Sequence, residues 1–220
     1  MTRLCGLLIV GLSMGCGSLS YRVDRDLLRD ISVENKLLLF EAENDVSIAL
    51  DEQEQIQRQL RDLRKQINEV GSQKGAADDD RDRAQNRKDD KAAQLAATSR
   101  QVLDLKRRFL EARVSALREK LSAQEGLVLV AFAKYELAKA KLIKKNNVRG
   151  AADIDLADFE KQVDKHVTKA KEEKVAVDGA AKEAEAKRQE WLTARNQLEK
   201  SSGGGASSPW ADDAMAWGAP

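Results

Sequence analysis

Apolar residues recur at alternating intervals of three and four residues over most of this 220-residue chain. This spacing places them on one narrow stripe of an α-helix, which has to be buried against another helix, as in a coiled coil. The only prolines are Pro209 and Pro220, so the strongest helix breaker is absent from everything before the tail. The pattern predicts an all-α protein built from long helices. It excludes a β-sandwich, a collagen-like chain and a disulfide scaffold.

Three stretches carry the spacing. The first stripe comprises Leu39, Ala42, Val46, Ala49, Gln53, Ile56, Leu60, Leu63, Ile67 and Val70. The second comprises Leu103, Arg107, Leu110, Val114, Leu117, Leu121, Gln124, Val128, Ala131, Tyr135, Ala138, Leu142 and Lys145. The third comprises Leu156, Phe159, Val163, His166, Ala170, Lys174, Val177, Ala181, Ala184, Arg188, Trp191, Arg195 and Leu198.

The second and third stripes are separated by a short connection, Asn146 to Gly150, that is typical of a helix end. They therefore predict a long antiparallel coiled-coil hairpin, with the first stretch as a third long helix N-terminal to it. Residues 126–134 are apolar on nearly all sides, which predicts that this part is covered from more than one side. Gly126 either weakens that helix or admits a close neighbour.

The first stripe is interrupted after Val70. Gly71 and Gly75 would each cost a helix interior about 1 kcal/mol, which predicts a turn or hinge. Residues 76–91 have no apolar side chain other than alanine and are either an exposed charged helix or part of a flexible connection. A tight hairpin would set Val70 against residues 78–82, which are four aspartates and an arginine. A wider connection is therefore favoured, which would bring Val70 to Leu95, Val102 and Leu105.

Charge is balanced and finely mixed. The chain has 38 Lys and Arg against 37 Asp and Glu, and 34% of its residues are charged. Nucleic-acid binding needs a surplus of basic residues gathered on one face. Here the basic runs are interleaved with acids, as in residues 78–83. The composition therefore predicts a solvated surface and excludes nucleic acid as a partner.

The first fifteen residues have the form of an export signal. Arg3 precedes an uncharged apolar stretch, residues 4–12, which is too short for the approximately 20 residues that span a bilayer. It ends in Leu12, Ser13, Met14, Gly15 and Cys16. This ending resembles the lipobox of bacterial lipoproteins, with Ser13 where that motif most often has leucine. The alternatives are an ordinary secretory peptide cut elsewhere and an uncleaved anchor.

The resemblance implies how each of the two cysteines is processed. Cys5 would be removed with residues 1–15, and Cys16 would receive the lipid and become the new N-terminus. An acylated cysteine with several chains is a stable membrane anchor. Gly17, in place of the aspartate that retains such proteins in the inner membrane, implies an outer-membrane location facing the periplasm. The membrane would then be a partner through the lipid.

Residues that could carry chemistry are few. His166 is the only histidine and lies on the third stripe, where it is predicted to be a polar core residue rather than a metal ligand. Asp78, Asp80, Asp82 and Asp89 have calcium-loop spacing, but the glycine of that loop is replaced by Arg83, so they are interpreted as a charge run. The sequence contains no catalytic fingerprint that we recognise. It predicts no enzyme, no metal, no cofactor other than the lipid, and no small-molecule substrate.

The C-terminal tail is distinct in composition. A Gly/Ser linker, residues 201–208, leads to a segment with Trp210, Met215 and Trp217. Because the two tryptophans are seven residues apart, a short helix formed on binding would present both on one face and could dock into a partner groove. The alternative is a degenerate tail that packs loosely or on nothing.

The sequence predicts a structural or adaptor protein of the cell envelope, with a protein partner or self-association through the coiled-coil stripes. Residues 136–142 are rich in Ala, Lys and Leu. In this composition they resemble the coiled-coil hairpins of efflux components and their adaptors. The alternatives are thus a hairpin docking onto an efflux or secretion channel, and a holdase-like periplasmic chaperone. The predicted parts are a signal peptide (1–15), a lipidated tether (16–25), a first helix (26–70), a hinge and charged connection (71–91), a second helix (92–146), a turn (147–155), a third helix (156–200) and the tail (201–220).

Overall fold

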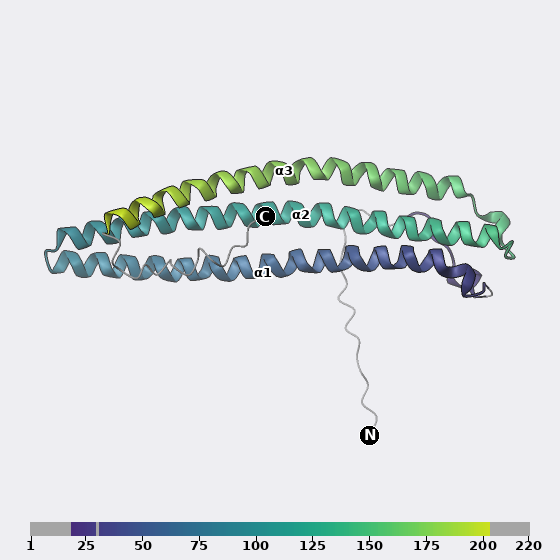
Figure 1. The fold of residues 1–220 in the computed structure, drawn as a ribbon, viewed down its shortest axis with the longest axis horizontal. Helices are drawn as coiled ribbons and strands as arrows, with labels where there is room; N and C mark the ends of the chain where they lie inside the picture. The colour runs from purple at the N-terminus through teal and green to yellow at the C-terminus, as the bar shows by residue number, and fades with distance from the viewer. Residues whose placement is uncertain (1–18, 30, 203–220) are drawn as a thin grey trace, which may run out of the picture. The chain divides into compact units, whose positions relative to one another are not determined.

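The computed structural model describes residues 19–29 and 31–202, which make an all-α fold without strands. The predicted fold class is therefore confirmed. Three long helices dominate, preceded and connected by short 3-10 turns (Figure 1). In chain order the elements are η1 (Arg25–Leu28), η2 (Glu34–Lys36), α1 (Leu37–Asn86), α2 (Asp90–Lys145), η3 (Ala151–Asp153) and α3 (Leu156–Ser201).

The helices contribute to two compact units. Unit 1 takes the described residues of Met1–Val46 together with Val128–Val167, and unit 2 takes Ser47–Leu127 with the described residues of Thr168–Pro220. Each unit contains parts of all three long helices and has its own apolar core.

In unit 2 the core is formed by buried side chains from α1, α2 and α3. Leu103 and Leu110 of α2 are nearly inaccessible to solvent, and Phe109 stacks on Trp191 of α3 with ring centroids 5.6 Å apart. The remaining buried members of this cluster are Leu60, Leu63, Val70, Ala77, Val102, Val114 and Leu198. Since α2 contributes on both of its sides, it is the central element of this core.

In unit 1 the core joins the end of α2 and the start of α3 to the N-terminal segment. Ala140 and Ile143 of α2 are fully buried, and they pack with Phe159 of α3. Val23, Ile31 and Leu39 come to the same cluster from the N-terminal side. The apolar stretch after Gly126 is covered as predicted, because most of its side chains are buried.

The turn between α2 and α3 lies where the sequence predicts it. α2 ends at Lys145, and Asn147 and Gly150 take left-handed backbone conformations with φ of 50° and 94°. Glycine adopts this region without the steric cost of a Cβ atom. The Asp155 carboxylate accepts a hydrogen bond from the Ala157 amide at 2.9 Å, which caps α3. The antiparallel hairpin of the second and third stretches is confirmed.

The first stripe is also confirmed, since every one of its ten positions is buried or half-buried. Helix α1 begins at Leu37, however, and not near residue 26 as predicted. The preceding residues form η1 and η2 instead.

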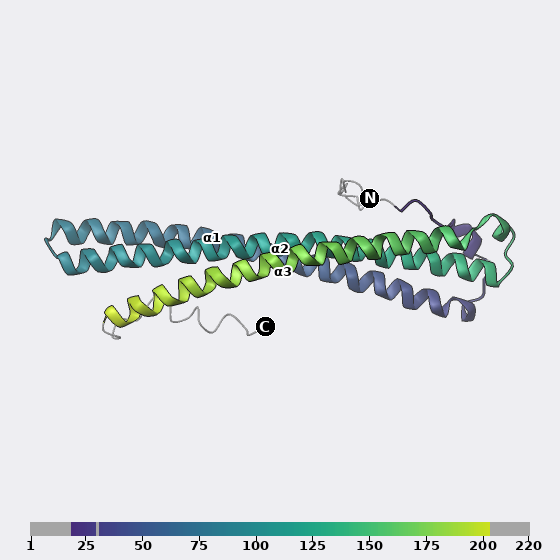
Figure 2. The ribbon, with the colours of Figure 1, turned by 90° about the horizontal axis from the view of Figure 1, so that it is seen from above.

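The predicted hinge at Gly71–Gly75 is wrong. α1 continues through both glycines to Asn86, and the chain reverses at Arg87–Asp89, where Lys88 has a φ of 57°. Figure 2 shows α1 and α2 side by side up to this turn. The stripe itself continues, because Ala77 and Ala84 are buried at the expected intervals. Small side chains are therefore enough to pack this part of α1.

The predicted wide connection between the first two helices is replaced by a tight turn after Asn86, but the main contact expected from it is confirmed. Val70 belongs to the same core cluster as Val102, and Leu105 packs against that cluster. Leu95 is 39% exposed and does not share in this core.

Alanine substitutions test whether residues 71–75 are helical. A Cβ atom added at Gly71 or Gly75 would meet nothing within 4 Å. Gly71→Ala and Gly75→Ala are therefore each expected to raise the free energy of unfolding by about 1 kcal/mol, because alanine loses less backbone entropy in a helix than glycine does. Chemical denaturation measures the change. Unchanged or lowered stability in both variants would contradict a continuous helix here.

The third stripe is correct except at two positions in the middle of α3, where the less exposed residue lies one position earlier. Lys174 and Ala181, which were predicted to be on it, are exposed, whereas the preceding Glu173 and Ala180 are half-buried. Glu173 approaches Gly126 of α2, where the missing Cβ leaves room for its carboxylate. The close neighbour that Gly126 was predicted to admit is thus this side chain.

Candidate functional site

Within unit 1, residues 20–21 are held by a buried glutamine of α3. Gln162 accepts hydrogen bonds through Oε1 from the Ser20 and Tyr21 amides, at 2.7 and 2.9 Å. Its Nε2 donates to the Tyr21 carbonyl at 3.0 Å. The side-chain amide therefore pairs with the backbone much as a neighbouring strand would, and it holds residues 20–21 in place.

A second buried polar group lies on the adjacent face of α2. Glu136 accepts the Val23 amide through Oε2 at 2.7 Å and the Lys139 ammonium through Oε1 at 2.5 Å, and both charged side chains are almost fully buried. Lys139 also lies 4.8 Å above the ring centroid of Tyr135. Burial raises the pKa of the Tyr135 hydroxyl, and nearby Glu43 raises it further. Glu136 thus joins a buried ion pair to the backbone of the N-terminal segment.

Apolar contacts complete the attachment of this segment. The Tyr21 and Phe159 rings lie 5.8 Å apart, and Val23 and Ile31 are buried in the unit 1 core. The prediction of a tether up to residue 25 is therefore wrong for residues 20–25, which are part of the folded body. The sequence carries no sign of this, since Glu136 and Gln162 lie more than a hundred residues away.

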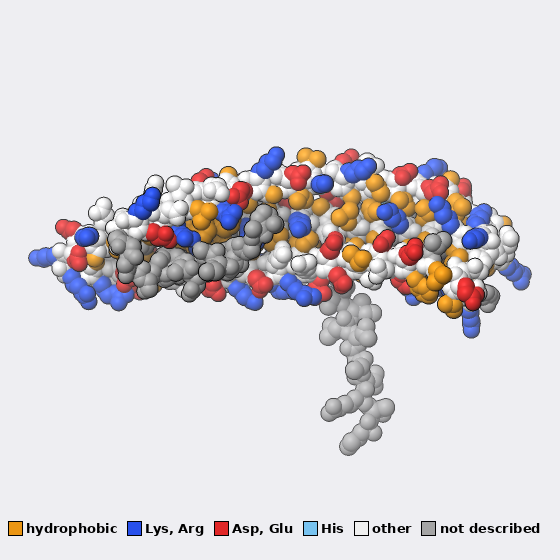
Figure 3. Space-filling model, viewed as in Figure 1, with side chains coloured by type: hydrophobic (Ala, Val, Ile, Leu, Met, Phe, Trp, Pro, Cys, Tyr) orange, Lys and Arg blue, Asp and Glu red, His pale blue; other side chains and the backbone are white. Residues whose placement is uncertain are grey.

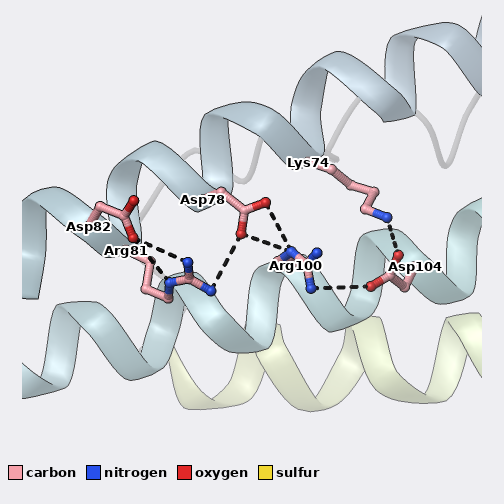
Figure 4. A network of polar contacts seen from close by, with 6 residues as sticks. All are labelled: Lys74, Asp78, Arg81, Asp82, Arg100 and Asp104. Atoms are coloured by element: carbon pink, nitrogen blue, oxygen red, sulfur yellow. Dashed lines mark hydrogen bonds and ion pairs between the residues drawn. The ribbon is translucent and has the colours of Figure 1, made fainter.

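Charged side chains connect α1 and α2 within unit 2 (Figure 4). Arg100 of α2 binds Asp78 of α1 with an Nε to Oδ1 distance of 2.8 Å, and Lys74 of α1 pairs with Asp104 of α2. Arg81 lies 3.5 Å from Asp78. Asp78, Asp80 and Asp82 are therefore helical and paired with arginines. Asp89 lies in the turn and accepts the Ala92 amide, so the run is not arranged as a calcium loop.

The Lys74–Asp104 pair predicts a specific pH dependence. The hydrogen bond from Lys74 lowers the pKa of Asp104 in the folded protein, and neighbouring arginines lower it further. The stabilisation is therefore present above the ordinary aspartate pKa of about 3.9 and is lost as the pH falls through the lower folded value. Asp104→Asn is expected to remove this part of the acid-side decline in thermal stability. Asp79→Asn, at an exposed position of α1, should leave the profile unchanged; equal profiles for both variants would contradict the assignment.

His166 is buried on α3, in line with the predicted core position. Among residues 19–29 and 31–202, no three His, Cys, Asp or Glu side chains gather as they would to hold a metal ion. The predicted signal-peptidase and lipidation residues (Leu12, Ser13, Met14, Gly15 and Cys16) and the predicted docking residues (Trp210, Met215 and Trp217) lie outside the described residues.

No helix in the described part of the chain combines the length and the apolarity needed to cross a membrane. Comparisons with protein families, with curated proteins and with solved structures find no match to this chain.

Proposed function

We propose that this chain is a non-enzymatic lipoprotein, anchored through Cys16 to the outer membrane of a bacterium and facing the periplasm, where it serves as a structural or adaptor component of the envelope. One observation carries the proposal. Cys16 ends an apolar leader with lipobox-like residues, and Ser20, four positions later, is hydrogen-bonded to the helical body. A lipid on Cys16 would thus be joined almost directly to the folded protein.

The character of the body supports a structural role. Its large apolar stripe residues are used to pack the three helices on one another, and buried Glu136 and Gln162 hold the N-terminal segment. The exposed surface is mixed in charge, with many ion pairs one helical turn apart. A partner would therefore meet a preformed helical surface, with the lipid setting its location.

The experiment compares the two cysteines. In a bacterial host supplied with labelled palmitate, the native chain and Cys5→Ser are expected to take up label and to fractionate with the outer membrane. Cys16→Ser is expected to lose both, because only the Cys16 thiol can accept the diacylglycerol group. Crosslinking in the same cells should recover envelope proteins with the native chain and fewer with Cys16→Ser. Label retained in Cys16→Ser would contradict the proposal.

A further inference from the structure

Exposed large apolar side chains in unit 1 are confined to its N-terminal part. Val33, Leu37 and Phe40 are 68%, 62% and 48% exposed, and Tyr21 is 41% exposed. The other part of unit 1, residues 128–167, exposes none. Val33, Leu37 and Phe40 follow one another at helical spacing into the start of α1, and we call these three residues the N-terminal apolar surface. The Tyr21 ring lies instead against Phe159 of α3. Figure 3 shows hydrophobic side chains gathered where α1 begins.

This surface is close in sequence and in space to the residues that hold the N-terminal segment. Glu43, three residues after Phe40, is hydrogen-bonded to Tyr135 of α2, and Val23 is hydrogen-bonded to Glu136, the next residue of the same helix. Two parts of the chain therefore contact neighbouring residues of α2: the segment around Val23 and the first turns of α1. They belong to the same end of unit 1.

The length of chain between Cys16 and Ser20 limits how far unit 1 can lie from an anchored lipid. Four residues reach at most about 14 Å when fully extended. Ser20 cannot leave the body without breaking its contact with Gln162. A lipid on Cys16 would therefore hold Ser20 within that distance of the bilayer surface. It would bring this end of unit 1 close to the bilayer, with apolar side chains that no part of the described chain covers.

We propose that the N-terminal apolar surface rests on the membrane, with Leu37 and Phe40 in the boundary between headgroups and acyl chains. This inference rests on the proposed lipid anchor at Cys16. Apolar side chains favour this boundary. Residues 19–46 carry seven acids and four bases, so the attraction is apolar rather than electrostatic. The occupant of the surface is thus a neutral phospholipid bilayer.

The experiment places a fluorescent probe on the surface of the lipidated full chain. Once Cys16 is acylated and the leader removed, no free thiol remains, so Phe40→Cys provides a single site for an environment-sensitive dye. Phe40 is half exposed, and its replacement should leave the core intact. Val175→Cys, at a residue of unit 2 that is 73% exposed, is the matched control. The purified proteins are incorporated into phosphatidylcholine–phosphatidylethanolamine vesicles with brominated acyl chains.

The expected result is that the dye at position 40 loses most of its emission to the brominated lipid, equally at low and high salt, while the dye at position 175 does not. Labelled fatty acid in the same preparation reports the anchor separately. Fatty acid present without selective quenching at position 40 would overturn the membrane contact and leave the anchor standing. Emission at position 40 that changes only with protein density would assign the surface to a second copy and likewise overturn it. Absence of fatty acid would overturn both proposals.

Discussion

Leu110→Ala is expected to lower the free energy of unfolding by about 2–5 kcal/mol, the range measured for large-to-small changes in well-packed cores. Leu110 has no solvent exposure and lies in the unit 2 core between contributions from α1 and α3. The substitution removes apolar contact area and leaves a cavity that the stacked Phe109 and Trp191 rings have little freedom to fill. Urea denaturation measures the change.

Leu95→Ala is the matched control on the same helix. Leu95 is 39% exposed and lies outside the core cluster. Its replacement is expected to change stability by no more than about 0.5 kcal/mol, as is usual for surface positions. Similar losses at the two positions would mean that α2 packs in another register.

Glu136→Ala is expected to cost about 3–5 kcal/mol, because it leaves the buried Lys139 ammonium without its carboxylate. It also removes the acceptor of the Val23 amide. The N-terminal segment should therefore loosen together with the loss of stability. Denaturation gives the first effect, and faster hydrogen exchange at Val23 gives the second.

Two further variants separate this effect from the loss of any ion pair. Glu54→Ala breaks the exposed pair with Arg58 on α1 and is expected to have little effect on stability. Replacing Glu136 and Lys139 together by methionine should recover much of the loss, because no unpaired charge then stays buried. If the double variant is as unstable as Glu136→Ala, the cost comes from the Val23 hydrogen bond and packing rather than from the stranded charge.

Local patterns in the sequence determined the three long helices and the hairpin. The apolar stripe of α1 could be predicted position by position, because a spacing of three and four residues has only one folded counterpart over so many turns. The turn after Lys145 could also be predicted. Gly150 takes a left-handed conformation and Asp155 caps the next helix, and both effects involve only neighbouring backbone. These features depend on residues within a few positions of one another.

Tertiary structure alone decided the remaining features. Helix α1 continues through Gly71 and Gly75 because Ala77 and Ala84 are buried beyond them. This packing outweighs the tendency of the glycines to interrupt a helix. In the middle of α3 the residue that faces α2 is Glu173, because the missing Cβ of Gly126 leaves room for its carboxylate. The docking of residues 20–23 depends on Gln162 and Glu136, which are polar residues at buried positions more than a hundred residues away. Such pairings follow from which surfaces meet in the folded chain, and periodicity within a single helix carries no information about them.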